Sequence, residues 1–181
     1  MRFTIIADTH FYGVSPVQVN ISDIDLYSIY TVFIGDIYDK ANCLKKDLPQ
    51  VEKEISELQE MAGSRYISGN HELLPKSKPY IVPNLVAFIH GDEVLWSKEK
   101  SEEFRSKKPC DSGITRTVKK LWANKHGSIS SDEAMLLVNY AKRLGVSAIV
   151  CGHVHPKQMY DSRINGIRVI CVPRGKTQID I

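Results

Sequence analysis

The chain has 181 residues, 43% of them hydrophobic and 25% charged, a composition that excludes disordered and fibrous proteins. A chain of this length buries enough surface to fold as a single domain, residues 1–181, without a disulfide or a structural metal. Its 24 basic and 21 acidic residues give a formal net charge of +3, which neither requires nor excludes a nucleic-acid partner.

Cysteine usage and apolar run lengths predict a cytoplasmic protein. None of the four cysteines forms a C-x-x-C pair, which indicates buried thiols in a reducing compartment. Residues 1–10 have a short apolar core and an acidic residue, Asp8, and therefore resemble neither a signal nor a transit peptide. No run approaches the roughly 18 apolar residues that a membrane span requires.

Five short apolar runs, each ending in a polar cluster, predict the strands of an α/β protein. In chain order the runs are residues 3–7, 31–34, 65–68, 85–89 and 147–151. Continuous apolar runs of this length are typical of strands buried on both faces. Polar residues directly after such strands lie where α/β sheets usually build their sites.

Two helices are predicted between these strands. Residues 48–62 carry apolar side chains at helical spacing, with Asp47 as a candidate N-cap. Residues 131–144 have the same spacing, and Ser130 with Glu133 forms a capping-box pattern.

Two further segments depart from this alternation. Asn165-Gly166 predicts a two-residue hairpin turn, and therefore an antiparallel element near the C-terminus. Residues 92–130 predict a helical insertion, with helices at about 98–108 and 113–124 separated by a proline.

The polar clusters after the strands predict a metal centre. They hold five of the six histidines together with carboxylate and amide side chains. The residues are Asp8, His10, Asp36, Asp39, Asn70, His71, His90, His153 and His155. Nitrogen and oxygen ligands without thiolate suit borderline to hard divalent ions, and this set is large enough for two. One carboxylate must then bridge the two ions to offset their repulsion.

These motifs, in this order, resemble the calcineurin-like metallophosphoesterase superfamily over about residues 3–155. The motifs are D-x-H (Asp8, His10), G-D-x-x-D (Gly35, Asp36, Asp39), G-N-H-E (Gly69 to Glu72), H-G (His90, Gly91) and G-H-x-H (Gly152, His153, His155). The resemblance implies a four-layer α/β/β/α sandwich, with the helical insertion before the last motif. It also implies two ligand sets that share Asp36, namely Asp8, His10, Asp36 and His155 around one metal, and Asp36, Asn70, His90 and His153 around the other.

The implied activity is hydrolysis of a phosphoester by a water that two divalent ions make nucleophilic at neutral pH. We expect Mn²⁺, and the ligand types also accept Fe, Zn, Ni or Co. His71 resembles the non-ligand histidine of the family, which neutralises transition-state charge or protonates the leaving oxygen, and Asp39 would orient it. A helix N-cap is the alternative role for Asp39. Asn70 and His71 are also expected to contact the substrate.

Departures from better-known branches favour a small phosphorylated substrate, a nucleotide-type molecule among the candidates. Residues 35–40 read G-D-I-Y-D-K and lack the arginine of protein phosphatases, so that activity is not expected. Small bacterial phosphodiesterases often carry cysteine where this chain has His71. The histidine widens the expected range from diesters with good leaving groups to poorer leaving groups and monoesters.

The insertion leaves a second function open. Seven basic residues and one acidic residue lie between positions 105 and 125, and Lys119 and Lys120 are candidate substrate contacts. Such a stretch suits a solvated helical face, a lid over a phosphorylated substrate, or a nucleic-acid surface, and the last would make the protein a nuclease. A non-catalytic scaffold of the same fold is a third reading, disfavoured because the motif set is complete.

Overall fold

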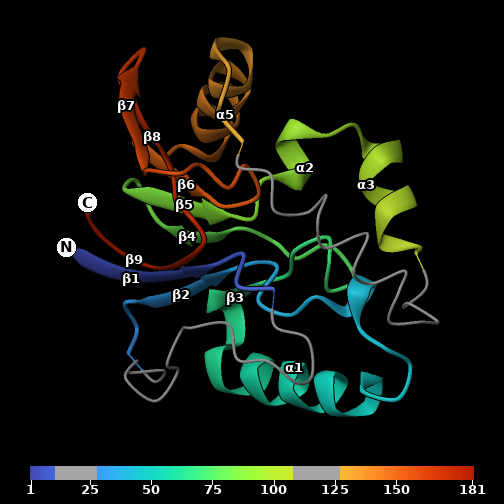
Figure 1. Cartoon of the computed structure of the whole chain (residues 1–181). Coiled ribbons are helices and arrows are strands. Elements are labelled where there is room, and N and C mark those ends of the chain that lie inside the picture. Colours follow the sequence, from blue (N-terminus) through green and yellow to red (C-terminus); the bar gives the residue numbers. More distant parts are fainter. Residues whose placement is uncertain (11–27, 108–126) are drawn as a thin grey trace.

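Two β-sheets face each other, with helices on both outer sides (Figure 1). The computed structural model describes residues 1–10, 28–107 and 127–181. In the described ranges the layers run α/β/β/α, as predicted, and the N- and C-termini lie side by side (Figure 1). Among the described residues, no helix is both long and apolar enough to cross a membrane.

The first sheet has the strand order β3-β2-β1-β9. It comprises β1 (Arg2–Ala7), β2 (Thr31–Ile34), β3 (Tyr66–Ile67) and β9 (Gly175–Asp180). β1, β2 and β3 are parallel, whereas β9 runs antiparallel to β1 over six residue pairs. β9 has no counterpart among the predicted strands.

The second sheet has the order β4-β5-β6-β8-β7. It comprises β4 (Tyr80–Val82), β5 (Val86–Ile89), β6 (Ala148–Cys151), β7 (Tyr160–Ile164) and β8 (Ile167–Cys171). β5, β6 and β8 are parallel, and the outer strands β4 and β7 are antiparallel to their neighbours. The predicted hairpin joins β7 to β8, and both turn residues, Asn165 and Gly166, have positive φ as a type I′ turn requires.

The helices cover the outer faces of the two sheets. α1 (Leu48–Ala62) covers the first sheet, and α5 (Ser131–Leu144) covers the second with its predicted capping box formed (Figure 1). α2 (Asp92–Leu95) and α3 (Lys98–Arg105) are the described part of the expected insertion. The helix expected at 113–124 lies outside the described residues. Two 3₁₀ helices, η2 (Lys40–Asn42) and η3 (Gly63–Arg65), flank α1.

Three apolar cores separate the four layers. Successive side chains of β1 divide between two of them: Ile5 packs between the sheets against Phe88, and Ile6 packs on the α1 side against Phe33. The third core joins the second sheet to α5 through Leu137. A strand with both faces buried needs a continuous apolar run, which explains the pattern in the sequence.

The cysteines of the described residues are buried thiols, as the sequence predicts. Cys43, Cys151 and Cys171 are free and buried. A hydrogen bond between Cys151 and Cys171, together with burial, raises the pKa of the Cys151 thiol well above its usual value. Cys110 lies outside the described residues.

Candidate metal centre

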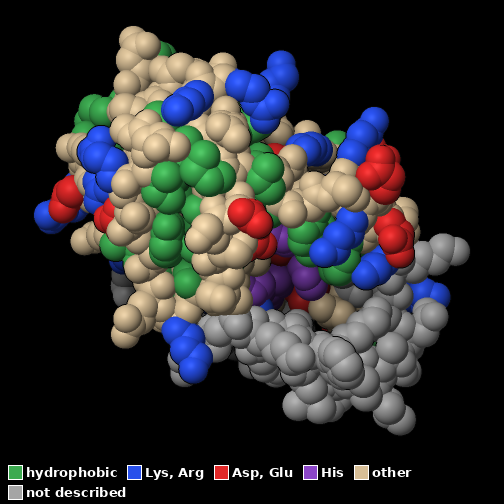
Figure 2. Space-filling view, turned by 90° about the horizontal axis from the view of Figure 1, so that it is seen from above, with side chains coloured by type: hydrophobic (Ala, Val, Ile, Leu, Met, Phe, Trp, Pro, Cys, Tyr) green, Lys and Arg blue, Asp and Glu red, His purple; other side chains and the backbone are tan. Residues whose placement is uncertain are grey.

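The motif side chains meet where the parallel strands of both sheets end. Asp8 and His10 follow β1, Asp36 and Asp39 follow β2, and Asn70 and His71 follow β3 of the first sheet; His90 follows β5, and His153 and His155 follow β6 of the second. Figure 2 shows histidine side chains at the bottom of a hollow in this face. The structure therefore brings all nine predicted residues of the strand-end motifs to one edge of the sandwich.

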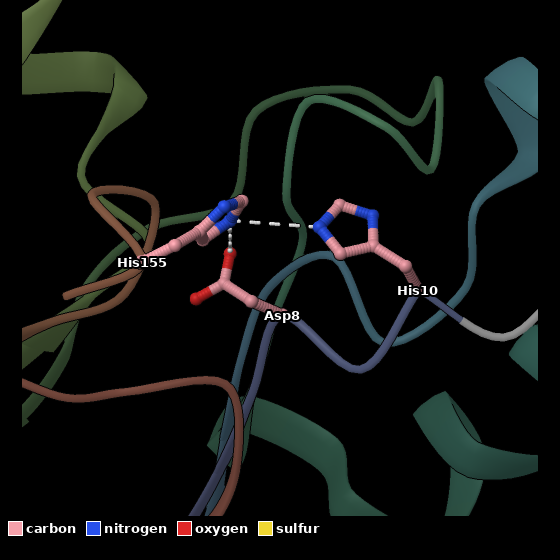
Figure 3. Close-up of side chains that lie close together, drawn as sticks. All are labelled: Asp8, His10 and His155. Atoms are coloured by element: carbon pink, nitrogen blue, oxygen red, sulfur yellow. Dashed lines mark hydrogen bonds and ion pairs between the residues drawn. The ribbon is translucent and has the colours of Figure 1, made fainter. Parts of the chain in front are cut away.

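One group of candidate ligands comes from β1 and the loop after β6 (Figure 3). His155 Nε2 lies 2.8 Å from Asp8 Oδ1 and 3.5 Å from His10 Nε2. The ligand atoms of Asp8, His10 and His155 all lie within 4.8 Å of one another. This is the spacing of side chains that surround one ion.

A second group joins the two sheets. The Nε2 atom of His90 lies 3.4 Å from Asp36 Oδ2, 3.1 Å from Asn70 Oδ1 and 3.2 Å from His153 Nδ1. His90 Nδ1 lies 3.0 Å from the carbonyl oxygen of Ile34, to which it donates, so its Nε2 atom is left to face the other three groups. With its Nε2 atom unprotonated, His90 adds a fourth acceptor to these three groups, and this donor set fits a divalent metal.

The pKa values of the two histidines in this second group shift in opposite directions. Burial lowers the pKa of His90, but the carboxylates of Asp36, Asp8 and Asp92 outweigh it and raise the pKa well above its usual value. Burial and, after it, the positive charge of the adjacent His90 lower the pKa of His153 to about 3, against the opposing effect of the Asp36, Asp8 and Asp92 carboxylates. The rings of His90 and His153 together therefore bind one proton tightly and resist a second.

Asp36 also belongs to a third group, with His10 and His71, whose ligand atoms lie within 4.8 Å of one another. Burial raises the pKa of the Asp36 carboxyl, but the surrounding histidines, His90 first, lower it well below its usual value. Asp36 is thus an anion shared by the groups on either side of it. Its Oδ1 atom also accepts a hydrogen bond from the backbone N–H of His71, 2.7 Å away.

The backbone around the candidate ligands is strained. Eight non-glycine residues of the described chain have positive φ, and five of them are predicted ligands. These five are Asp8, His10, Asp36, His153 and His155. Strained residues of this kind cluster at functional sites, where the surrounding structure holds them in place. Gly35 has a φ of +87°, and a β-carbon there would overlap the ring of His90.

His71 and Asp39 form a hydrogen-bonded pair beside the three groups. His71 Nδ1 lies 2.9 Å from Asp39 Oδ1. The same carboxylate caps η2, accepting from the backbone N–H of Asn42 at 3.1 Å and from its side-chain amide at 2.7 Å. The two roles considered for Asp39 therefore coexist. Burial lowers the pKa of His71, but the carboxylates of Asp36 and Asp39 outweigh it and raise the pKa.

Glu72, the last residue of the G-N-H-E motif, has a role that the sequence did not indicate. Its side chain is fully buried and accepts hydrogen bonds from the backbone N–H groups of Ile37 and Gly69, both at 2.9 Å. The hydroxyl of Tyr66 donates to it at 2.5 Å. Glu72 therefore joins the loop that carries Asp36 to the loop that carries Asn70.

Arg174 is a second residue that sequence reasoning missed. It lies between β8 and β9, and its Nη2 atom is 2.8 Å from His155 Nδ1. Burial lowers the pKa of Arg174, and the nearby carboxylates of Asp8, Asp36 and Asp39 oppose this only in part. The sequence did contain a signal for Arg174, because Pro173-Arg174-Gly175 follows an apolar run just as the predicted polar clusters do. That run forms β8, which is parallel to β6, the strand that His153 and His155 follow.

Arg105 of the insertion contacts the core of the site. Its Nη1 atom donates to the carbonyl oxygens of Gly69 at 2.9 Å and Leu74 at 2.8 Å, and its Nη2 atom pairs with the buried Asp92. Lys107 lies over the ring of Phe104, with Nζ 3.8 Å from the ring centroid. Lys119 and Lys120 lie outside the described residues.

A pocket of about 380 Å³ opens over the candidate ligands. Its walls include Trp96 and Phe104 on the insertion side, Glu133 of α5, and Arg174. His10, Asp36, Asn70, His71, His153 and His155 also line it. Six of the predicted site residues therefore face one cavity of a size suited to a small ligand.

Comparison with known proteins places this site in a family. The pattern of the calcineurin-like phosphoesterase family matches residues 1–157. No curated protein shows significant similarity to the chain.

Two solved structures resemble the chain at low sequence identity, both with TM-scores below 0.5. Vacuolar Protein Sorting 29 from Cryptosporidium parvum is 12% identical, with a TM-score of 0.49 over 96% of this chain and 74% of that one. Phosphopantetheinyl hydrolase (PptH) from Mycobacterium tuberculosis is 11% identical, with a TM-score of 0.34 over 95% of this chain and 89% of that one. The family pattern covers every predicted site residue up to His155, and the chain therefore belongs to the calcineurin-like phosphoesterase family.

Proposed function

We propose that this protein is a hydrolase of small phosphorylated substrates that uses two divalent metal ions. Family membership and the groups of possible metal ligands support metal-dependent phosphoester hydrolysis. The observation that carries the binuclear proposal is the position of Asp36, which belongs to two of the three ligand groups. A shared carboxylate is what a pair of adjacent cations needs.

Two ligand sets are proposed. Asp8, His10, Asp36 and His155 hold one ion, and Asp36, Asn70, His90 and His153 hold the other. When bound, two such ions acidify a water and withdraw charge from the phosphoryl oxygens. Mn²⁺ is the proposed ion, and Fe, Zn, Ni and Co suit the same donors.

His71 is the proposed proton donor to the leaving oxygen. Asp39 holds its ring through Nδ1 and leaves Nε2 for the substrate. A protonated imidazole at this position also offsets negative charge in the transition state. This assistance matters most for poor leaving groups, which supports activity on phosphomonoesters as well as diesters.

Arg174 is proposed to bind phosphoryl oxygens. A guanidinium only donates hydrogen bonds, so its contact at Nδ1 places the ring proton of His155 on Nε2, facing Asp8. Ligation through Nε2 would require that nitrogen to lose its proton, and a proton on Nδ1 would then oppose the guanidinium. The contact between Arg174 and His155 would then be lost, and the guanidinium would turn toward the pocket that it already lines.

One described residue of the basic insertion argues against the nuclease alternative. Arg105, one of the seven basic residues counted there, is engaged with Asp92 and two backbone carbonyls, and is therefore withdrawn from any phosphate-binding surface. The scaffold alternative is disfavoured by the convergence of the complete motif set.

The test is hydrolysis of p-nitrophenyl phosphate and bis-p-nitrophenyl phosphate by metal-free, Mn²⁺-loaded and Mg²⁺-loaded protein. We expect turnover only with metal, and its loss in Asp36→Asn. Asp161→Asn, a substitution on the edge strand β7, is the matched control and should keep full activity. A folded, metal-loaded protein that hydrolyses neither compound would contradict the proposal.

A further inference from the structure

Two aromatic rings border the candidate metal centre on the insertion side. Trp96 and Phe104 lie with their ring centroids 5.7 Å apart, and both line the pocket. The ring of Trp96 is 4.5 Å from that of His153, and the ring of Phe104 is 4.7 Å from that of His71. This aromatic wall, Trp96 and Phe104, therefore begins where the phosphoryl group is proposed to react.

Neither ring of the aromatic wall belongs to the three apolar cores. Both side chains are only half-buried, although large aromatic residues usually find a place inside a protein. Apolar surface left on a pocket wall is stabilised when a ligand covers it. Among the described residues, the two rings contact each other, two site histidines and two lysines, and they pack into none of the three cores.

The wall is held in place before any ligand arrives. Ser97 caps α3 by accepting a hydrogen bond from the backbone N–H of Lys100 at 3.2 Å. At the other end of α3, Arg105 is paired with Asp92, and Ser101 donates to the same carboxylate at 2.5 Å. A rigid stacking surface loses little entropy on binding.

The surroundings of the wall favour a planar, anionic ligand. Lys100 Nζ lies 4.2 Å from the Trp96 ring centroid, and Lys107 Nζ lies 3.8 Å from that of Phe104. Figure 2 shows apolar and basic side chains bordering the histidines of the hollow. The pocket volume, about 380 Å³, is near the lower limit for small-molecule sites and suits a single nucleotide rather than a polymer.

We infer that the aromatic wall binds the base of a nucleoside monophosphate whose phosphate occupies the metal centre. The inference rests on the proposed hydrolytic function. In the reaction, water adds to phosphorus, the bond between phosphorus and the ribose oxygen breaks, and that oxygen takes a proton. The products are a nucleoside and inorganic phosphate. Stacking depends on the flat face that all bases share, so tolerance of different bases is expected.

The test compares AMP with ribose 5-phosphate, which share the phosphomonoester and the leaving oxygen and differ only in the base. Stacking contributes about 1–3 kcal/mol per base, so we expect a kcat/KM about 5- to 150-fold higher for AMP. Trp96→Ala should remove most of the difference in kcat/KM between AMP and ribose 5-phosphate. Trp96→Phe should retain the preference for AMP. Tyr30 is an exposed ring elsewhere on the protein, and Tyr30→Ala should change kcat/KM for neither substrate.

Binding without catalysis separates this inference from the proposed function. Calorimetry of metal-free protein should detect adenosine but not ribose, and Trp96→Ala should abolish the adenosine signal. If no phosphoester is hydrolysed but adenosine binding depends on Trp96, the inference stands without the hydrolase. If phosphoesters are hydrolysed while AMP and ribose 5-phosphate are equivalent and adenosine does not bind, the wall is not a base site. Phe104→Leu provides a second variant should Trp96→Ala fail to fold.

Discussion

Arg105 and Asp92 form an ion pair next to the candidate metal centre, with Nη2 of the arginine 3.1 and 2.9 Å from the two carboxylate oxygens. The Asp92 side chain is 0% exposed and that of Arg105 11%. Because Arg105 also donates to the carbonyl oxygens of Gly69 and Leu74, the pair connects the insertion to the loop that carries Asn70 and His71. The insertion therefore supports the site as well as bordering it.

Arg105→Met is expected to destabilise the protein by about 3–5 kcal/mol, because it leaves the buried Asp92 carboxylate without its partner. Urea unfolding of the metal-free protein measures the change. Lys98→Met is the control, since Lys98 is exposed and its pair with Glu102 lies on the surface of the same helix. Equal stability of the two variants would show that the Arg105–Asp92 pair contributes no more than a surface pair.

His71→Ala is expected to lower kcat by about 10²–10⁴-fold while both metal ions stay bound. The loss should be larger for an alkyl phosphate than for p-nitrophenyl phosphate, because the poorer leaving group needs the proton more. Steady-state kinetics and metal analysis of the purified variant provide the two measurements. Loss of an ion would instead make His71 a ligand, a role compatible with its position near His10 and Asp36.

Metal uptake by the metal-free protein is expected to release a proton near pH 7. The carboxylates around His90 raise its pKa well above the usual value, so the ring carries a proton that an ion at Nε2 must displace. Metal affinity should therefore increase as the pH rises toward that pKa. Calorimetric titration of Mn²⁺ in buffers of different ionisation enthalpy counts the protons, and a heat that does not vary with the buffer would contradict the expectation.

Arg174→Met is expected to weaken inhibition by inorganic phosphate about tenfold, and to raise KM for a phosphomonoester more than it lowers kcat. The physical reason is loss of a charge-assisted hydrogen bond to a phosphoryl oxygen. Lys176→Met, an exposed cation two residues further along β9, serves as the matched control. If phosphate inhibits Arg174→Met as strongly as it inhibits the wild type, Arg174 contacts His155 but does not bind phosphate.

Glu72→Gln is expected to destabilise the protein by about 1–3 kcal/mol. The amide of glutamine presents donors to groups that themselves donate, so at least one buried hydrogen bond is lost. Denaturant unfolding measures the effect, with the exposed Glu60→Gln as control. If both variants unfold at the same denaturant concentration, the link between the Asp36 and Asn70 loops does not depend on the carboxylate.

Much of the fold could be predicted because its signals are local. The helices at 48–62 and 131–144 have the predicted bounds, since their apolar spacing and the glycines that follow them are local signals. Ser130 caps the second helix as predicted, whereas the side chain of Asp47, the candidate cap of the first, makes no capping hydrogen bond. The hairpin at Asn165-Gly166 follows from the backbone conformations that those two residues accept. β9 could not be predicted in this way, because Gly175–Asp180 is polar and becomes a strand only by pairing with the edge of β1.

The sequence by itself determined that the nine motif side chains gather at the candidate site, because parallel strands end at one edge and the polar clusters follow those strands. Only the tertiary structure decided which ligand groups each side chain belongs to and which other residues hold it in place. Asp36 lies between two ligand groups, Asp39 both caps a helix and holds His71, and Arg105 reaches from the insertion to the Gly69 carbonyl. These relationships depend on distances between segments far apart in the chain, which no local pattern of residues specifies.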